Sequence, residues 1–273
     1  MNRITAPQTR RARRVAFAVW VTILSLLVGT LFIGLTVLTV GLWLADPSYA
    51  ETNPVLDLGF FALGAVLIGA GFVSQVRAPE RRIAGLQQAG IGLFALAVAG
   101  LLGNRVEPLW GGLILVGATV VALALHPAHG ELLRRGAGLS APLAALSLVA
   151  AIPAIVYAKH MLALARDAGP SCFMGQCARG DRFAEMAALA VAVVLVASLA
   201  SARTGGWRVP AWSAGAAAAI LGLVSVALPD VTGSVGWAGG ALAAAWGVMV
   251  VAAAESQMRQ TKTTMNDPEG GQR

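Results

Sequence analysis

Eight long runs without any charged residue dominate this sequence of 273 residues. Each run is close to or above the ~17–25 residues that a helix needs to cross ~30 Å of hydrocarbon. The backbone must satisfy its own hydrogen bonds in lipid, so we expect each run to be helical. A β-barrel would need ~10-residue alternating segments, and the sequence has none. The sequence therefore predicts an all-α fold, a polytopic transmembrane helical bundle. The expected spans are residues 17–44, 58–76, 83–103, 109–125, 139–162, 183–202, 209–228 and 234–254.

The composition supports this interpretation, since 57% of the residues are hydrophobic and only 12% are charged. A soluble domain carries roughly 25% charged residues. The net charge of +7 comes from basic residues beside the apolar runs, without a basic face or aromatic stacking set. We therefore expect a lipid bilayer, and not a nucleic acid, as the main partner. Abundant Ala, Val, Gly, Leu and Arg with few Lys are typical of GC-rich bacteria, which favours a bacterial plasma membrane.

The basic residues also predict the orientation of the chain. Fifteen of the 20 lie in the two tails or in every second loop, for example Arg81, Arg82 and Arg203. The positive-inside rule places these segments and both termini in the cytoplasm. The tails, residues 1–14 and 257–273, are polar and are expected to be disordered, on either side of a transmembrane domain of residues 15–256.

The first span could instead be a cleaved signal peptide, because Ser48-Tyr49-Ala50 follows a basic N-terminus and an apolar run. That run is far longer than the ~7–15 apolar residues of a signal peptide. We expect an uncleaved first helix, and cleavage would leave seven.

Several short similarities, spaced by about half the chain, indicate a tandem repeat of two four-span units. Ala89-Gly90 and Ala214-Gly215 are 125 residues apart, and Trp110 and Trp237 are 127 apart. Four is an even number of spans, so both units would have the same orientation, as in transporters built from parallel repeats. Chance similarity is the alternative in a sequence so rich in Ala, Gly and Val.

The two cysteines, Cys172 and Cys177, lie in one outer loop. The compartment outside a bacterial membrane is oxidising, so we expect a structural disulfide between them. The alternatives are a redox-active pair, disfavoured because the exchange motif is CxxC, and metal binding, which needs more ligands than this loop has.

Ionisable residues gather at the outer ends of the fifth and sixth spans, where charge near hydrocarbon is costly and needs a partner or a function. We expect Lys159 to pair with Asp181 or Glu185, and His160 to lie near Glu185. The alternative is ordinary snorkelling of long side chains near helix ends. The candidate outer polar cluster is Tyr157, Lys159, His160, Asp181, Arg182 and Glu185.

No other motif indicates a catalytic, metal or cofactor site. His126 and His129 flank a proline and have no cysteine on their side of the membrane. Strings such as Gly90-Ile91-Gly92 lie within spans, where a dinucleotide site is not expected and small residues let helices pack closely. We therefore expect no catalytic residue, metal or cofactor.

The last three spans, from Gly180-Asp181-Arg182-Phe183-Ala184-Glu185 through Gly206-Trp207-Arg208-Val209-Pro210 to Trp246-Gly247 and Glu255, resemble uncharacterised multi-pass membrane proteins of GC-rich bacteria. The resemblance implies the location and carries no activity.

Two functions follow from these observations. The first is a non-enzymatic membrane component, such as a subunit, scaffold or accessory protein, acting with a membrane-protein partner or as a homo-oligomer. The second is a permease for a small solute. The absence of ionisable residues from the span centres favours the first, and the internal similarities favour the second.

We predict that reporter fusions after Asn53, Asn104 and Gly175 will read as outside, and that fusions after Arg81 and Gly205 will read as inside. The reason is the alternation of basic and acidic loops. A single loop on the wrong side would contradict the eight-span topology.

Overall fold

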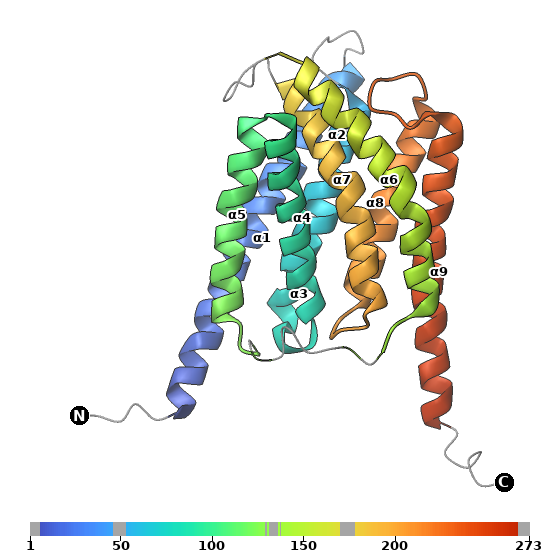
Figure 1. Cartoon of the computed structure of the whole chain (residues 1–273). Coiled ribbons are helices and arrows are strands. Elements are labelled where there is room, and N and C mark those ends of the chain that lie inside the picture. The colour runs from blue at the N-terminus through green and yellow to red at the C-terminus, as the bar shows by residue number, and fades with distance from the viewer. Residues whose placement is uncertain are drawn as a thin grey trace, which may run out of the picture.

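The computed structural model describes residues 6–45, 53–128, 130, 136, 138–169 and 178–266. Within these ranges the chain is a bundle in which eight helical segments are long and apolar enough to cross a membrane, as predicted. α1 begins and α9 ends at the same end of the bundle (Figure 1). We call this end the terminal face and the opposite end the far face.

The second span is built from three consecutive pieces, and each of the other spans is one α-helix. Its pieces are α2 (Pro54–Phe61), the π-helix η1 (Ala62–Gly69) and α3 (Ala70–Arg77). The first span is α1 (Ala6–Ala45), and the third to eighth are α4 (Ile83–Gly103), α5 (Val106–Leu125), α6 (Ala141–Asp167), α7 (Ala178–Ser201), α8 (Arg208–Ala227) and α9 (Gly236–Asn266). A short 3₁₀ turn, η2 (Pro79–Arg81), joins α3 to α4.

Two helices run further than the apolar runs predicted. α1 already starts at Ala6, and α9 continues to Asn266, so much of both expected tails is helical. Arginine, alanine, glutamine and methionine have high helix propensity, and these segments contain no residue that would stop the helix early. The apolar runs located the membrane spans, but they did not define where the helices end.

The eight spans fall into an inner and an outer group. In the second, third, sixth and seventh spans, 61–72% of the most apolar stretch is buried inside the bundle. In the first, fourth, fifth and eighth spans the share is only 17–28%. The order outer, inner, inner, outer therefore occurs twice along the chain.

Contacts between the spans repeat in the same way. Each half consists of two helical hairpins that pack together, and α4 of the first half packs on α7 of the second. The corresponding pair, α8 of the second half and the second span of the first half, also packs together. The arrangement is what two four-span units related by an approximate two-fold axis would give.

Individual contacts repeat with it. The Trp20 indole donates a hydrogen bond to the Ala118 carbonyl, and the Trp246 indole donates one to the Leu146 carbonyl, both at 2.9 Å. Each of these bonds joins the first and fourth spans of one half. Close approaches also correspond, because Gly112 lies against Ala97 in the first half and Gly240 lies against Gly222 in the second. Gly222 follows Ala97 by 125 positions, the spacing of the similarities seen in the sequence.

We predict that Gly222→Leu will destabilise the protein by about 1–3 kcal/mol, the usual cost of overpacking. A Cβ at this position would lie 2.5 Å from both the Ala244 nitrogen and the Gly240 oxygen, which are backbone atoms that cannot move aside easily. Thermal unfolding of the purified protein in detergent measures the effect. Gly34→Leu is the matched control, since a Cβ at Gly34 has nothing within 4 Å. Equal melting temperatures for the two variants would contradict the close packing of α8 on α9.

Candidate functional site

Arg182 is the centre of a small ionic network at the far face. Its Nη1 donates a hydrogen bond to Glu185 Oε2 at 2.9 Å, and its Nε lies 3.7 Å from Asp57 Oδ1. Its guanidinium also stacks over the Phe60 ring, 3.6 Å from the ring centroid. All three charged side chains are largely buried, with 8–16% of their surface exposed. One arginine therefore joins α7 to α2, which belong to different halves of the bundle.

The local sequence explains where these side chains lie. α7 begins at Ala178, several residues before the apolar run, so Asp181 and Arg182 belong to its first turns. Asp57 lies in the first turn of α2. A carboxylate near the N-terminus of a helix is stabilised by the helix dipole. The network thus lies where two helix N-termini meet.

Asn53 fixes the start of α2. Its side-chain oxygen accepts hydrogen bonds from the Val55 and Leu56 backbone nitrogens at 3.0 and 3.2 Å. Its amide nitrogen donates to the Thr232 carbonyl at 2.9 Å. Thr232 lies between α8 and α9, so the last hairpin of the second half holds the start of the second span of the first half.

Arg105 makes the equivalent contact in the opposite direction, in which the last hairpin of the first half holds the start of the second span of the second half, α7. It lies between α4 and α5, is 2% exposed, and donates a hydrogen bond to the Ala165 carbonyl of α6. Its guanidinium packs against Gly180 in the first turn of α7, where a Cβ would lie 2.3 Å from Arg105 Cζ. Gly180 is therefore glycine because the guanidinium occupies the space that a side chain would need.

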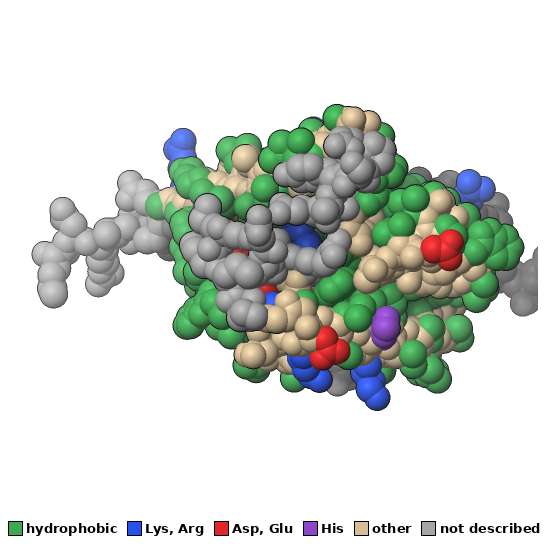
Figure 2. All heavy atoms as spheres, turned by 90° about the horizontal axis from the view of Figure 1, so that it is seen from above, with side chains coloured by type: hydrophobic (Ala, Val, Ile, Leu, Met, Phe, Trp, Pro, Cys, Tyr) green, Lys and Arg blue, Asp and Glu red, His purple; other side chains and the backbone are tan. Residues whose placement is uncertain are grey.

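The structure brings together only part of the predicted outer polar cluster. Arg182 and Glu185 are paired, and Asp181 is buried beside them with 3% of its surface exposed. The Tyr157 hydroxyl donates instead to the Gly233 carbonyl at 2.5 Å, which joins α6 to the loop before α9. Seen from above, the far face has acidic and basic side chains towards its centre as well as at its rim (Figure 2).

Lys159 and His160 lie on a helix that neighbours α7, as expected, but they do not join the ionic network. Both side chains are exposed, whereas Ala158, Met161 and Ala165 form the buried side of α6. Glu185 pairs with Arg182 of its own helix, and no ion pair of Lys159 is found within the described residues. His160 is therefore not on the side of α6 that packs into the bundle. Cys172 and Cys177 lie outside the described residues, so their disulfide stays a prediction.

Sequence analysis missed two members of the site, Asp57 and Arg105. Asp57 stands just before the predicted span 58–76, although Asn53-Pro54 is a recognisable helix start four residues earlier. Arg105 stands between two predicted spans, 83–103 and 109–125, and nothing in the sequence pattern indicates that its side chain is buried. In the described part of the chain, no three His, Cys, Asp or Glu side chains are placed to hold a metal ion.

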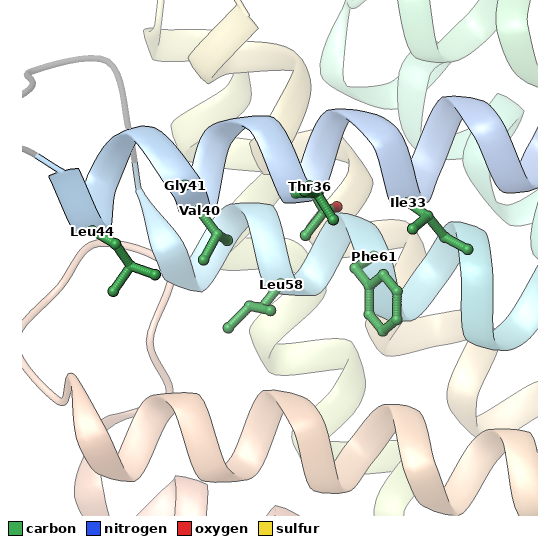
Figure 3. A pocket seen from close by; sticks show the side chains of 8 residues that line it. Ile33, Thr36, Val40, Gly41, Leu44, Leu58 and Phe61 are labelled. Atoms are coloured by element: carbon green, nitrogen blue, oxygen red, sulfur yellow. The ribbon is translucent and has the colours of Figure 1, made fainter.

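Two apolar grooves lie close to the network on the outside of α2. One, with a volume of about 400 Å³, lies between α1 and α2 and is shown in Figure 3. The other, of about 470 Å³, continues from it towards α8, and both are lined by Val40 and Leu58. Thr36 is the only polar residue in the first lining, and its hydroxyl already donates to the Phe32 carbonyl at 2.7 Å. These grooves suit an apolar neighbour and not a polar solute.

No family model, curated protein or solved structure matches this chain. The class that its fold defines is a polytopic helical bundle with the architecture of a membrane protein.

We predict that Arg182→Gln will destabilise the protein by about 3 kcal/mol, because it leaves two largely buried carboxylates without their cation. The triple variant Asp57→Asn, Arg182→Gln and Glu185→Gln should recover most of the lost stability. It has no buried charge at these three positions. Thermal unfolding in detergent checks both effects. Lys159→Gln is the exposed control and should change stability by less than about 0.5 kcal/mol. A triple variant as unstable as Arg182→Gln would contradict the ionic network.

Proposed function

We propose that this chain is a permease for a small solute, operating at the joint between its two four-span halves. The observation that carries the proposal is the Arg182 network, which joins inner helices of the two halves at the far face. Transporters built from repeats move one repeat against the other around a site at the interface between them. A strong contact that is polar and local suits this motion, because it can be broken and remade without repacking the core.

A second joint between the two halves lies at the terminal face. The Ala84 backbone nitrogen, at the start of α4, donates to the Gly205 carbonyl at 3.0 Å. Gly206 has a φ of 80°, and a Cβ there would lie 2.6 Å from Arg82 Cα. The loop between the second and third spans therefore packs directly on the loop between the sixth and seventh spans, which is its counterpart in the other half.

The two joints differ in a way that suits alternating access. The far joint is made by side chains, through the Arg182 ion pairs and the hydrogen bonds of Asn53 and Arg105, whereas the terminal joint is made by backbone contact between two short loops. Opening one joint while the other stays closed would expose the inner helices to one side of the membrane at a time. Both joints are formed in the described structure.

We predict that proteoliposomes containing the protein will swell faster than empty liposomes after mixing with at least one of urea, glycerol, formamide and ammonium acetate. Stopped-flow light scattering measures the rate. Glu185→Gln should change this rate severalfold because it weakens the far joint, whereas His160→Ala should leave it unchanged because His160 is exposed on α6.

The control for folding is the elution profile and melting temperature of each variant. If none of the four solutes enters faster than it enters empty liposomes, the permease proposal fails. If Glu185→Gln and His160→Ala alter the rate equally, the far joint has no part in transport.

A non-enzymatic membrane component is the second candidate, favoured by the apolar grooves beside α1. A hydrophobic helix of a partner could occupy them. Gly41 lines the first groove and has nothing within 4 Å of its Cβ position, so Gly41→Phe would fill it. Loss of a stoichiometric partner from Gly41→Phe, but not from Gly34→Phe, would favour this candidate over the permease.

A further inference from the structure

The second span changes its helix type at its centre. η1 takes up the middle eight of 24 residues, between α2 and α3, and it is a π-helix. π-helical residues make up well under 1% of globular proteins and are frequent at functional sites. η1 belongs to an inner span and packs against α1, α4, α7 and α8, so this unusual segment lies where the two halves meet.

Gln88 of α4 reaches this segment from the side. Its Nε2 donates a hydrogen bond to the Leu67 carbonyl of η1 at 2.6 Å. The side chain is fully buried, yet its Oε1 has no hydrogen-bond partner. An amide oxygen without a partner in an apolar interior costs about 1–3 kcal/mol. Gln88 therefore offers a free acceptor to a group that the protein itself does not supply.

A second amide lies below it, towards the terminal face. Gln75 of α3 is 1% exposed, and its Nε2 donates to the Arg82 carbonyl at 2.5 Å and to Ser74 Oγ at 3.1 Å. Its Oε1 also has no partner. Ser74 and Gln75 point at Gly85 of α4, where a Cβ would lie 2.0 Å from Ser74 Oγ. Gln88 follows Gly85 by three residues, so it lies on the same side of α4 about one turn deeper.

The same line of polar groups continues to the surface. Arg82, which accepts the Gln75 hydrogen bond, packs against Gly206 in the loop between α7 and α8. In that loop Arg203 Nε and Thr204 Oγ1 are buried and have no hydrogen-bond partner. Polar groups with unused hydrogen-bonding capacity thus run from the terminal face along the α3–α4 contact to η1.

We propose that this line is a water-accessible half-channel, and that Gln75 and Gln88 bind the permeating solute within it. Water is the ordinary partner of buried polar groups that lack one. The half-channel begins at the terminal joint, passes Gln75, and ends at Gln88 and η1, where apolar side chains such as Leu63 and Leu67 close it from the far side. The solute assignment rests on the proposed permease function, whereas water access does not.

The chemistry of the half-channel selects a small uncharged solute with N–H or O–H donors. The free atoms of both glutamines are acceptors, so a solute bound to them must present hydrogen-bond donors. Arg82 and Arg203 near the entrance disfavour cations by charge repulsion. Urea and formamide carry N–H donors, and glycerol carries O–H donors.

Thiol labelling tests water access directly. In a background with Cys172→Ser and Cys177→Ser, Gln88→Cys should react with the membrane-impermeant reagent 2-sulfonatoethyl methanethiosulfonate from the terminal face only. The rate should exceed that of Leu86→Cys at least tenfold. Leu86 is the matched control because it is fully buried on the same helix and is nearer to the terminal face. No reaction of Gln88→Cys from the terminal face, or a rate equal to that of Leu86→Cys, overturns the half-channel.

A second variant guards against misfolding of Gln88→Cys. Gln88→Leu removes the unpartnered acceptor with little change in volume, so it should melt at the same or a higher temperature. Swelling in urea should nevertheless slow about tenfold. An unchanged swelling rate with higher stability would show that Gln88 does not bind the solute.

The two proposals fail in different ways. Labelling of Gln88→Cys from the terminal face, together with no swelling of proteoliposomes with the unaltered protein, leaves the half-channel and removes the permease. Swelling of those proteoliposomes without labelling of Gln88→Cys leaves the permease and removes the half-channel.

Discussion

The rest of this structure depends on the requirement that each backbone polar group be hydrogen-bonded where water is absent. Helices meet this requirement within one segment, which is why eight apolar runs become eight helical spans. The same requirement makes a buried polar side chain informative when one of its atoms has no hydrogen-bond partner. In a bundle whose walls offer few donors or acceptors, Arg105 and Gln88 stand out because their hydrogen-bonding groups exceed what their surroundings use. At such a group, the missing hydrogen-bond partner can be a water molecule, a solute, or a protein group that reaches it after a movement.

Much of the fold could be predicted from the sequence, because crossing a membrane depends on length and mean hydropathy. What could not be predicted is which side of each helix packs against other helices and which side faces outwards. A helix in water shows its buried side by apolar periodicity, but a helix in lipid is apolar all round. Lys159 and His160 therefore stand at the expected end of α6, but not on the side that packs into the bundle. The residues that reveal the packed side are small ones, such as Gly222 against Gly240.

Only the part of the candidate site that lies on one helix could be predicted, because the sequence does not show which helices pack together. Arg182 and Glu185 are three residues apart on one helix, and residues at this spacing lie on the same side. Asp57 comes from a segment 125 residues earlier, and only the packing of α2 on α7 brings it close. η1 could not be predicted at all, since its sequence is as apolar as that of an ordinary α-helical span.

The two halves repeat their helices but not their charges. Asp57 and Asp181 both lie in the first turn of an inner helix that opens at the far face. Arg182 has no counterpart, because the residue after Asp57 is Leu58. Two glutamines likewise line the inner hairpin of the first half, whereas the corresponding hairpin of the second half carries Arg203 and Thr204. The two halves are thus similar frames, and the unequal charges make the contact between them asymmetric, with the cation supplied by the second half alone. An ion pair of this kind can be lost or kept without changing the repeated helices, which is why the Arg182 network is the feature of this joint that mutation can test most directly.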